Sequence, residues 1–466
     1  MNIITLTVDN RIRTNRNALG NTLSRIMSKF TFKNPKYLDA ERRGFSTRYI
    51  PEYIDAYGMD EESLILPRGS IRQVLGIIKS AGLHCRIDDN RRSLKPVQFD
   101  FHGELKKFQK TAVEGMLKRD FGTLSAPTGA GKTIMALAII AERKQPTLII
   151  VHSKELLNQW IERVETFLGI PSSEIGIIGN GKKFIENRLT VGIVNSVYPL
   201  ARELKEHVGH LIVDECHRCP SRTFTEAVTA FDCRYMLGLS ATPWRRDGLT
   251  QLIYWHLGNK VHEVDRSSLI EQGHVLAADV VPRETGFATW VDASTQYQEM
   301  LSELVEDNER NSLIVQDVAH EACSETGVCL VLTDRKTHVD ILARMLSAKG
   351  IEVERLTGAI SVKERQRVVT RLNAGLVRVI VATGQLIGEG FDSKHLSTLF
   401  IACPIRFDGR LIQYIGRVLR PAPGKEKALI YDYVDSNVGV LDNAARGRQR
   451  VYDRAFSPCK NYYRVT

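Results

Sequence analysis

The sequence is poor in cysteine and contains no long apolar run. Its eight cysteines form no repeated framework, which argues against a secreted domain held together by disulfides. No stretch approaches the roughly 18 consecutive apolar residues of a membrane-spanning helix. The opening MNIITLTVDNRIR lacks the basic and apolar regions of a secretory signal. Internal repeats and low-complexity tracts are absent as well. We therefore expect a soluble, cytoplasmic protein.

The sequence is, however, long and carries an excess of positive charge. A chain of 466 residues exceeds one ordinary hydrophobic core and predicts two or three domains. The formal net charge of +10 favours a polyanionic partner such as nucleic acid. Residues 1–100 carry 17 Lys and Arg against 11 Asp and Glu, so they supply +6 of this excess. Because this segment also mixes aromatic with basic residues, we expect an accessory DNA-binding domain. A basic domain that only packs against its neighbour is the alternative.

Short apolar runs after about residue 104 predict two successive α/β domains. Runs that are apolar throughout are typical of parallel strands covered by helices on both faces. The first series comprises residues 147–152, 189–195, 210–215 and 235–242, and the second comprises residues 327–333, 351–358, 377–383, 396–403 and 427–434. The expected divisions are a small N-terminal α+β domain over 1–100, α/β domains over 101–255 and 306–440, a connector over 256–305 and a tail over 441–466.

The stretch LSAPTGAGKTIMALAII, residues 124–140, predicts a phosphate-binding loop. A strand end, a glycine-containing loop and an apolar helix follow one another, which is the context of a P-loop. Glycines at 129 and 131 let backbone N–H groups turn inward around phosphates, and the helix N-terminus adds its dipole. Lys132 is expected to reach the β and γ phosphates of ATP, while the Thr133 hydroxyl ligates Mg²⁺. Ala126 stands where the usual eight-residue pattern has its first glycine. The expected nucleotide-contacting residues of the loop are Thr128, Gly129, Ala130, Gly131, Lys132 and Thr133.

The stretch LIVDECHRCPS, residues 211–221, is open to two interpretations. Cys216, His217 and Cys219 place three soft metal ligands within four positions, which is compatible with zinc. A buried strand ending in Asp214 and Glu215 is instead typical of a nucleotide hydrolase. Asp214 would then coordinate Mg²⁺, and Glu215 would activate the attacking water. We favour the hydrolase because the P-loop lies upstream and because a zinc ribbon needs a second cysteine pair.

These motifs together resemble superfamily 2 helicases of the DExH type. The resemblance is carried, in the family's order, by APTGAGKT, DECH, SATPWRRDG (240–248), ATGQLIGEGFD (382–392) and QYIGRVLR (413–420), over about residues 104–435. Within the superfamily the pattern resembles the XPB-like and restriction-motor branch, which includes UvsW-like branch-migration helicases of tailed bacteriophages. The resemblance implies two tandem RecA-like domains, and the cytoplasm of the host cell if a phage encodes the protein.

The resemblance also implies roles for individual residues around the nucleotide. Gln109 matches the family glutamine that recognises adenine. Gly390 and Asp392 match the position that contacts ribose. The residues that match the link between nucleotide state and the nucleic-acid track are His217, Ser240 and Thr242.

A second group of residues matches the arginine-finger helix and the nucleic-acid track. Gln413, Arg417 and Arg420 are spaced by four and three, which predicts one shared helical face. Arginines on that face would stabilise charge on the transferred phosphoryl group. Backbone phosphate contacts are expected from Ser153, Lys154, Gln159, Thr383 and Gln385.

The implied function is that of an ATP-driven DNA helicase or translocase. We expect 3′ to 5′ movement by a monomer on single-stranded, forked or branched DNA in repair, recombination or replication, with ATP and Mg²⁺ as cofactors. A restriction-type motor that moves along duplex DNA and an RNA helicase are alternatives within the same enzyme class. A nucleic-acid clamp with a vestigial ATPase is the alternative outside it, and the complete motif set argues against a clamp.

Overall fold

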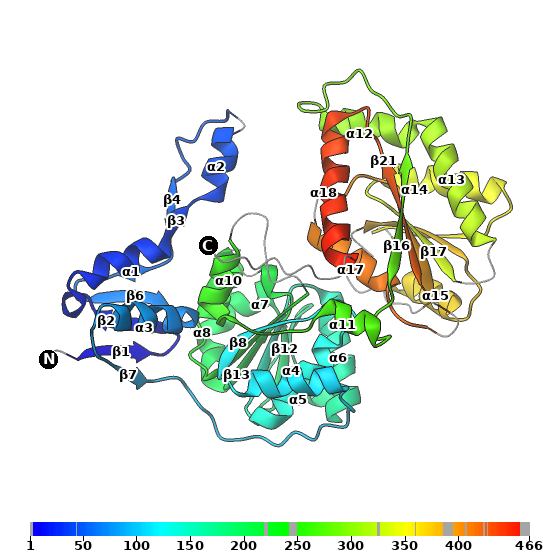
Figure 1. The fold of residues 1–466 in the computed structure, drawn as a ribbon. Helices are drawn as coiled ribbons and strands as arrows, with labels where there is room; N and C mark the ends of the chain where they lie inside the picture. Colours follow the sequence, from blue (N-terminus) through cyan, green and yellow to red (C-terminus); the bar gives the residue numbers. More distant parts are fainter. Residues whose placement is uncertain are drawn as a thin grey trace. The chain divides into compact units, whose positions relative to one another are not determined.

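The computed structural model describes residues 3–456 except 43, 219–221, 242–248, 324–326, 359, 385–394, 406–407, 423–424 and 426. The chain forms two compact units (Figure 1). Unit 1 comprises Met1–Ala126 and Gly131–Val264, and unit 2 comprises Pro127–Ala130 and Asp265–Thr466.

Residues 4–89 form a small α+β domain within unit 1. Five of its described strands make a sheet in the order β5-β6-β2-β1-β7, in which only β1 and β7 are parallel neighbours, and β3 and β4 form a separate antiparallel pair. Alternate residues of β1 are buried, and α3 buries Val74 and Ile78 against the same core, as expected for half-buried strands covered by an amphipathic helix. The elements are β1 (Ile4–Val8), β2 (Arg11–Asn15), α1 (Thr22–Phe30), β3 (Thr31–Lys33), α2 (Pro35–Arg42), β4 (Tyr53–Asp55), β5 (Gly58–Met59), β6 (Ser63–Pro67), η2 (Arg68–Ser70), α3 (Ile71–Ser80) and β7 (Cys85–Asp89).

The rest of unit 1 is a doubly wound α/β domain. Its described strands form an eight-stranded sheet in the order β11-β10-β12-β9-β13-β14-β8-β15, parallel except for the pair β10 and β11. The elements are α4 (Lys107–Leu117), β8 (Phe121–Ser125), α5 (Lys132–Arg143), β9 (Thr147–Val151), α6 (Lys154–Leu168), β10 (Gly176–Gly179), β11 (Lys182–Phe184), β12 (Leu189–Ile193), α7 (Val194–Val197), α8 (Ala201–Leu204), β13 (His210–Val213), α9 (Arg222–Thr229), β14 (Tyr235–Ser240), α10 (Thr250–Leu257) and β15 (Lys260–Glu263).

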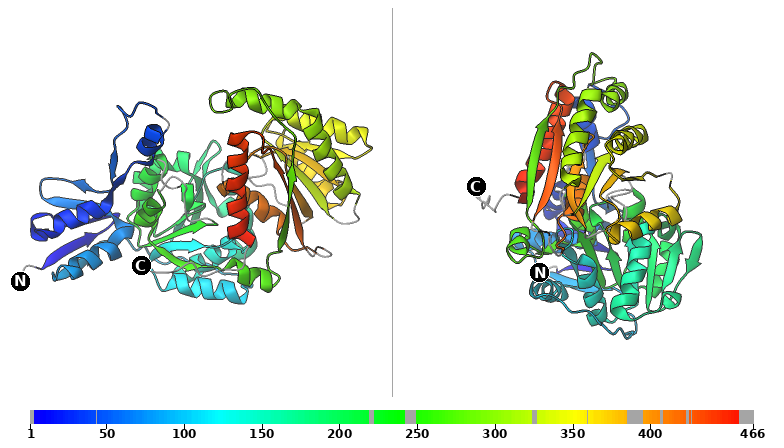
Figure 2. Two further views of the ribbon diagram at one scale, coloured as in Figure 1. Left: turned by 45° about the horizontal axis from the view of Figure 1, so that its top comes forward. Right: turned by 90° about the vertical axis from the view of Figure 1, so that its right-hand side faces the viewer.

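Unit 2 contains a second α/β domain. Within its described residues a six-stranded, all-parallel sheet has the order β16-β21-β20-β17-β19-β18. Helices α13 and α14 cover one face, and α17 and α18 cover the other (Figures 1 and 2). The elements are α11 (Arg266–Glu271), β16 (Ala278–Glu284), α12 (Tyr297–Glu306), α13 (Asn308–Ala322), β17 (Val328–Thr333), α14 (Lys336–Ala348), β18 (Val353–Leu356), α15 (Val362–Asn373), β19 (Val379–Thr383), β20 (Leu396–Ile401), α17 (Asp408–Val418), β21 (Ala428–Val434) and α18 (Gly439–Phe456).

The predicted fold class is confirmed. Strands β9 and β13 are buried along their whole length, because helices cover both faces of the sheet. The segment 256–305, expected as a connector, supplies β15 to the sheet of unit 1 and β16 to the sheet of unit 2. No helix in the described part of the chain is long and apolar enough to cross a membrane.

The N-terminal domain is joined to the α/β domain of unit 1 by a buried tryptophan. Trp255 of α10 is 2% exposed and belongs to the apolar core of the N-terminal domain. Its ring lies 4.8 Å from that of Phe30, and its Nε1 donates to Oε1 of Gln73 over 2.9 Å. The core of the small domain is therefore completed by a residue that lies far along the chain.

Candidate active site

The loop between β8 and α5 has the backbone of a phosphate-binding loop. Gly129 and Gly131 have φ values of +88° and +83°, in the left-handed region that favours glycine. A Cβ on Gly131 would lie only 2.5 Å from Nε2 of Gln109. Larger residues are therefore excluded from position 131 both by the backbone and by its neighbour.

Ala126 and Lys132 fix the two ends of this loop. Ala126 is fully buried, and its N–H donates to the carbonyl of Ser240 over 3.1 Å, which joins the loop to the end of β14. Lys132 is the first residue of α5, and its Nζ donates to the carbonyl of Ala126 over 3.1 Å. A small buried residue at position 126 thus takes the place of the usual glycine. Thr133 follows in the first turn of α5 and is half-buried.

Gln109 contributes to the same corner of unit 1. It lies in the first turn of α4 and is 6% exposed. Its Oε1 accepts the backbone N–H of Lys106 over 2.9 Å in a capping box, which fixes the start of the helix. Because Nε2 points at Gly131, the glutamine connects the helix start with the loop.

The two predicted carboxylates follow β13. Asp214 is 8% exposed, and both of its oxygens accept hydrogen bonds. Oδ2 accepts from Nε1 of Trp160 over 2.8 Å, and Oδ1 accepts from the N–H of Glu215 over 2.9 Å. Glu215 itself has a φ of +49°, which is unusual for a residue with a side chain. Such a backbone costs about 1–3 kcal/mol and is typical of functional sites.

His217 connects the acidic pair to the end of β14. Its Nδ1 lies 3.2 Å from Oε2 of Glu215 and 3.2 Å from Oγ of Ser240, which is fully buried. The geometry therefore places Glu215, His217 and Ser240 in one polar chain. Thr242, the other predicted member of this motif, lies outside the described residues.

Burial and neighbouring charges shift the pKa values of the two carboxylates in opposite directions. Burial, together with the charge of Glu215, raises the pKa of Asp214 to about 6, although Trp160 and Lys132 act to lower it. Burial also acts to raise the pKa of Glu215, but contact with His217 and the charge of Lys132 outweigh it and lower that pKa. The charge of Lys132 thus acts to lower the pKa of both carboxylates. Such proximity is expected where one site holds both phosphate and metal.

The donor set fits a small divalent cation. The Thr133 hydroxyl and the Asp214 carboxylate are the hard oxygen donors that Mg²⁺ prefers. Oε2 of Glu215 is buried beside Nδ1 of His217, and a carboxylate oxygen with one such neighbour keeps a lone pair for a water molecule.

The zinc interpretation of the same stretch depends in part on Cys219, which lies outside the described residues. Cys216 is 0% exposed and packs in the apolar core with Leu257 and Phe224. Within the described ranges, no cluster of three or more His, Cys, Asp or Glu is arranged to hold a metal ion.

Four of the five residues predicted to contact the nucleic-acid backbone lie within the described parts of the chain. Ser153 is the N-cap of α6, where its Oγ accepts the N–H of Leu156 over 3.3 Å. Lys154 is exposed, Gln159 is half-buried, and Thr383 ends β19. Gln385, Gly390 and Asp392 lie outside the described residues.

The predicted arginine-finger helix ends earlier than its spacing indicates. Helix α17 ends at Val418, so Arg420 lies beyond it and does not share its face. Two causes act together: Pro421 disfavours a helical conformation at the residue before it, and Nζ of Lys425 donates to the carbonyls of Val418 and Arg420. The side chains of Gln413 and Arg417 lie outside the described parts of the molecule.

Comparison with known proteins assigns the family. The model of the type III restriction enzyme res subunit matches residues 102–245, and that of the helicase conserved C-terminal domain matches residues 311–422. The two matches together span more than half of the chain. The chain is a superfamily 2 helicase. It belongs to the type related to XPB and restriction motors, and it binds and hydrolyses ATP.

Relatives of this helicase are named as both DNA and RNA enzymes. "Probable helicase D10" of Escherichia phage T5 is 26% identical over 329 residues, 71% of each chain. "DNA 3'-5' translocase XPB2" of Sulfurisphaera tokodaii is 40% identical over 149 residues, 32% of this chain and 33% of its own. A protein of Acanthamoeba polyphaga mimivirus named as an ATP-dependent RNA helicase is 23% identical over 436 residues, 89% of this chain and 80% of its own.

A solved structure confirms the fold of the helicase. Dbp5 of S. cerevisiae bound to RNA and ADP BeF3 covers 77% of this chain and 89% of its own, with a TM-score of 0.53 and 15% identity. The tandem RecA-like architecture of the two α/β domains is thereby shown.

Trp160 is the site residue that the sequence motifs missed. It follows Gln159 in a segment predicted to grip nucleic acid, yet its indole donates to the carboxylate of Asp214. The available signal was a tryptophan on the buried face of α6, and buried tryptophans generally need a partner for Nε1.

Proposed function

We propose that this helicase is a DNA translocase that moves 3′ to 5′ and acts on forked or branched DNA in repair, recombination or replication. The observation that carries the proposal is the polar chain from Glu215 through His217 to Ser240, beside the phosphate-binding loop. This polar chain connects Glu215 in the proposed hydrolytic centre with Ser240 at the end of β14. In this family, the motif at that strand end links the nucleotide site to the nucleic-acid track. The DNA substrate and the direction are supported by the likeness to the archaeal 3′ to 5′ translocase.

In the proposed reaction, water attacks the γ-phosphorus of ATP, the bond to the β–γ bridging oxygen breaks, and ADP leaves. Glu215 accepts the proton of the attacking water, for which its lowered pKa keeps it ionised. Lys132 binds the β and γ phosphates, and its positive charge offsets theirs beside the two carboxylates. Mg²⁺, held by Thr133 and Asp214, would neutralise charge on the same phosphates. Arg417 and Arg420 are proposed as the arginine fingers, with Gln413 beside them.

The remaining predicted residues complete this proposal. Gln109 would recognise adenine through Nε2, since Oε1 already accepts the N–H of Lys106. Loop residues 128–131 would donate backbone N–H groups to phosphate, and Gly390 and Asp392 would contact ribose. The proposed contacts to the nucleic-acid backbone are Ser153, Lys154, Gln159, Thr383 and Gln385, and the proposed coupling residues are His217, Ser240 and Thr242.

The N-terminal domain, residues 1–100, is proposed as an accessory grip on branched DNA. The segment from β3 to β4, including α2, projects from the domain (Figure 1). Phe45 and Tyr49 on it are 66% and 89% exposed, and the guanidinium of Arg48 lies 5.8 Å from the Tyr49 ring. Exposed aromatic rings beside a cation are typical of surfaces on which unpaired bases stack.

This accessory role is tested by replacing Phe45 and Tyr49 with alanine. Deleting the domain is a poorer test, because deletion would expose Trp255. The double variant is expected to bind forked DNA about thirtyfold more weakly or worse, since each of two stacked bases contributes about 1–3 kcal/mol, and to keep its affinity for duplex DNA. Unchanged affinity for forks would refute the accessory role.

The proposed substrate is tested by strand displacement and ATP hydrolysis on a panel of single-stranded, duplex, forked and four-way DNA, with forked RNA beside them. Displacement should be fastest on forked or four-way DNA that carries a 3′ strand for loading. Faster displacement of RNA would replace the proposal with the RNA helicase that the viral relative favours. Translocation on duplex DNA without strand separation would indicate a restriction-type motor.

A further inference from the structure

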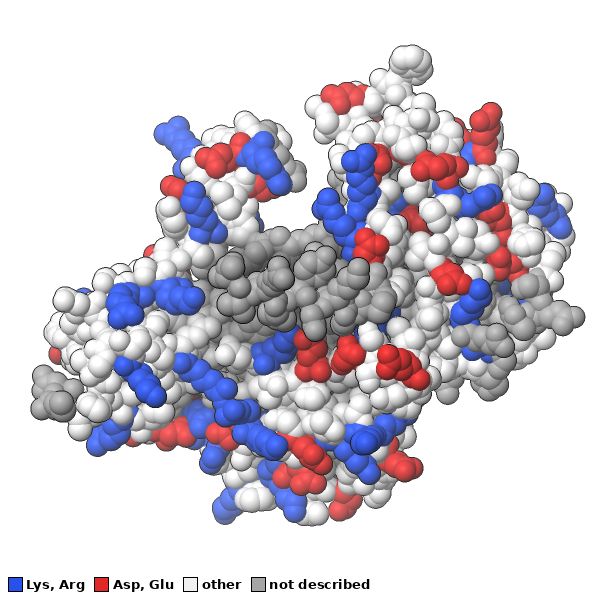
Figure 3. Space-filling model, in the orientation of Figure 1, with Lys and Arg blue, Asp and Glu red and all other residues white. Residues whose placement is uncertain are grey.

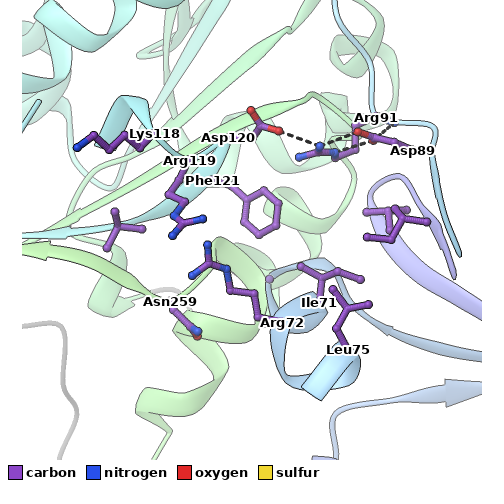
Figure 4. A pocket seen from close by; sticks show the side chains of 14 residues that line it. Ile71, Arg72, Leu75, Asp89, Arg91, Lys118, Arg119, Asp120, Phe121 and Asn259 are labelled. Atoms are coloured by element: carbon purple, nitrogen blue, oxygen red, sulfur yellow. Dashed lines mark hydrogen bonds and ion pairs between the residues drawn. The ribbon is translucent and has the colours of Figure 1, made fainter. Parts of the chain in front are cut away.

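A second candidate site lies in unit 1, away from the nucleotide loop, where the N-terminal domain adjoins β8. A cavity of about 330 Å³ opens there (Figure 4). Its walls come from β1, η2, α3 and β7 on one side, and from the turn between α4 and β8 together with the start of β15 on the other. We call this space the seam cavity.

The Phe121 ring lines the seam cavity and lies close to two arginines, of which Arg91 also lines it. The guanidinium carbons of Arg68 and Arg91 each lie 5.6 Å from the centroid of the Phe121 ring. Arg68 is 2% exposed and donates to the carbonyl of Cys233 over 2.7 Å. Arg91 pairs with Asp89 over 2.7 Å and with Asp120 over 2.8 Å. These ion pairs engage Asp89 and Asp120, the two carboxylates that line the cavity.

The rim of the seam cavity carries a different set of cations. Arg72 of α3, together with Lys118 and Arg119 of the α4–β8 turn, lines the cavity and is exposed. Among the described residues, none of these three side chains has a carboxylate within ion-pair distance. Figure 4 shows the guanidinium groups of Arg72 and Arg119 turned toward one another across the opening. Two facing guanidinium groups repel one another, and an anion between them would remove the repulsion.

The surface around the cavity favours an extended anion. Figure 3 shows Lys and Arg side chains, with Asp and Glu among them, over the surface of unit 1. Arg86 on β7 and Lys95 in the segment after β7 are exposed, whereas Arg92 between them pairs with Asp232 over 3.0 Å. Three cations gather at the rim of the cavity, and Arg86 and Lys95 add exposed positive charge elsewhere on unit 1. Such a distribution suits the repeated phosphates of a nucleic-acid backbone better than a single small anion.

We propose that the seam cavity binds a backbone phosphate of the nucleic acid, held by the facing guanidinium groups of Arg72 and Arg119 with Lys118 beside them. Arginine pairs suit this role because each guanidinium presents a planar fork of donors to phosphate oxygens. One phosphate would then be held by the N-terminal domain and the α/β domain together. The site deepens the proposed function, on which it rests, by locating where unit 1 holds its substrate outside the motor track.

The test is the affinity of an Arg72→Glu, Arg119→Glu double variant for labelled forked DNA and forked RNA, measured by fluorescence anisotropy over a range of salt concentrations. Affinity is expected to fall about tenfold or more near 0.1 M salt, and the slope of log affinity against log salt to fall by about one, the value of one lost phosphate contact. A Lys79→Glu, Lys110→Glu variant is the matched control. It reverses two exposed charges on α3 and α4 that do not line the cavity, and it should lose less affinity.

The thermal unfolding midpoint of each variant checks the fold. If the glutamate variant has a lowered unfolding midpoint, Arg72→Gln with Arg119→Gln removes the positive charges without introducing negative ones. DNA and RNA affinities equal to those of the control variant would overturn the proposal.

Calorimetric titration with inorganic phosphate separates the two sources of the anion. Suppose that free phosphate binds and that its binding depends on Arg72 and Arg119, while the variant keeps its nucleic-acid affinity. The cavity would then be assigned to a small anion, which also overturns the proposal. ATP hydrolysis without nucleic acid should stay at the wild-type rate, and failure of the wild-type protein to displace strands would count against the proposed function alone.

Discussion

At the scale of single residues, the site depends on contacts that sequence motifs only partly reveal. Lys132, Asp214 and Glu215 were predicted from their spacing and their strand and loop context, and the structure brings them into one electrostatic cluster. The partner of Trp160 was not predictable, because its bond to Asp214 joins positions 54 residues apart on different elements. Positive φ at Glu215 was equally hidden, since a motif records residue types and not backbone strain.

A Trp160→Phe variant tests the positioning of Asp214. Phenylalanine keeps most of the buried ring but removes the indole donor, and hydrogen bonds to charged groups contribute about 1.5–3 kcal/mol. ATP hydrolysis is expected to fall about tenfold, with a higher Mg²⁺ concentration needed for half-maximal rate. Trp255→Phe is the control, because it removes the indole donor to Gln73 and should lower stability without changing hydrolysis. Equal hydrolysis rates in the two variants would show that Trp160 only packs.

At the scale of elements, the strands were predictable and the ends of some helices were not. Runs such as 147–152 and 210–215 became β9 and β13 because a strand covered on both faces needs apolar residues throughout. The end of α17 was missed because the spacing of Gln413, Arg417 and Arg420 was extended past Val418, although Pro421 and Lys425 follow closely in the sequence. The contact that docks the N-terminal domain was not predicted because Trp255 lies far along the chain, in the sequence of the other domain.

Alanine substitutions at Gly69 and Gly76 test the packing of the N-terminal domain against α10. A Cβ on Gly69 would lie 2.3 Å from the carbonyl oxygen of Tyr254 and 2.6 Å from that of Trp255, both backbone atoms of α10. Gly69→Ala is therefore expected to lower stability by about 1–3 kcal/mol, the cost of overpacking a close contact. Gly76→Ala, in the interior of α3 with open space around it, should raise stability by about 0.5–1 kcal/mol. Denaturant unfolding measures both, and equal shifts would contradict the close contact.

At the scale of the whole molecule, buried neutral histidines predict sensitivity to acid. Burial lowers the pKa of His338 to about 3, and the neutral ring hydrogen-bonds to Thr333 and Asn311 over 2.9 Å each. Burial, with the charge of Arg143, lowers the pKa of His210 as well. Since the unfolded chain binds protons at these histidines near pH 6.5, stability is fully present above that pH and is lost as the pH falls toward the folded values.

Unfolding by urea at pH 7 and pH 5 measures this loss. The His338 contribution alone should lower the free energy of unfolding by about 2 kcal/mol between the two pH values. A His338→Gln variant should start from lower stability, because its hydrogen bonds are disturbed, but should show a smaller difference between the two pH values. An identical pH dependence in the variant would show that His338 does not titrate on unfolding.

The assignment of Lys132 and Glu215 to hydrolysis is tested most directly by the rate of ATP hydrolysis with and without forked DNA. Added DNA should raise the wild-type rate. Lys132→Ala and Glu215→Gln should each lower the stimulated rate about a hundredfold or more, while DNA binding remains close to the wild-type value. Wild-type hydrolysis in either variant would contradict the mechanism.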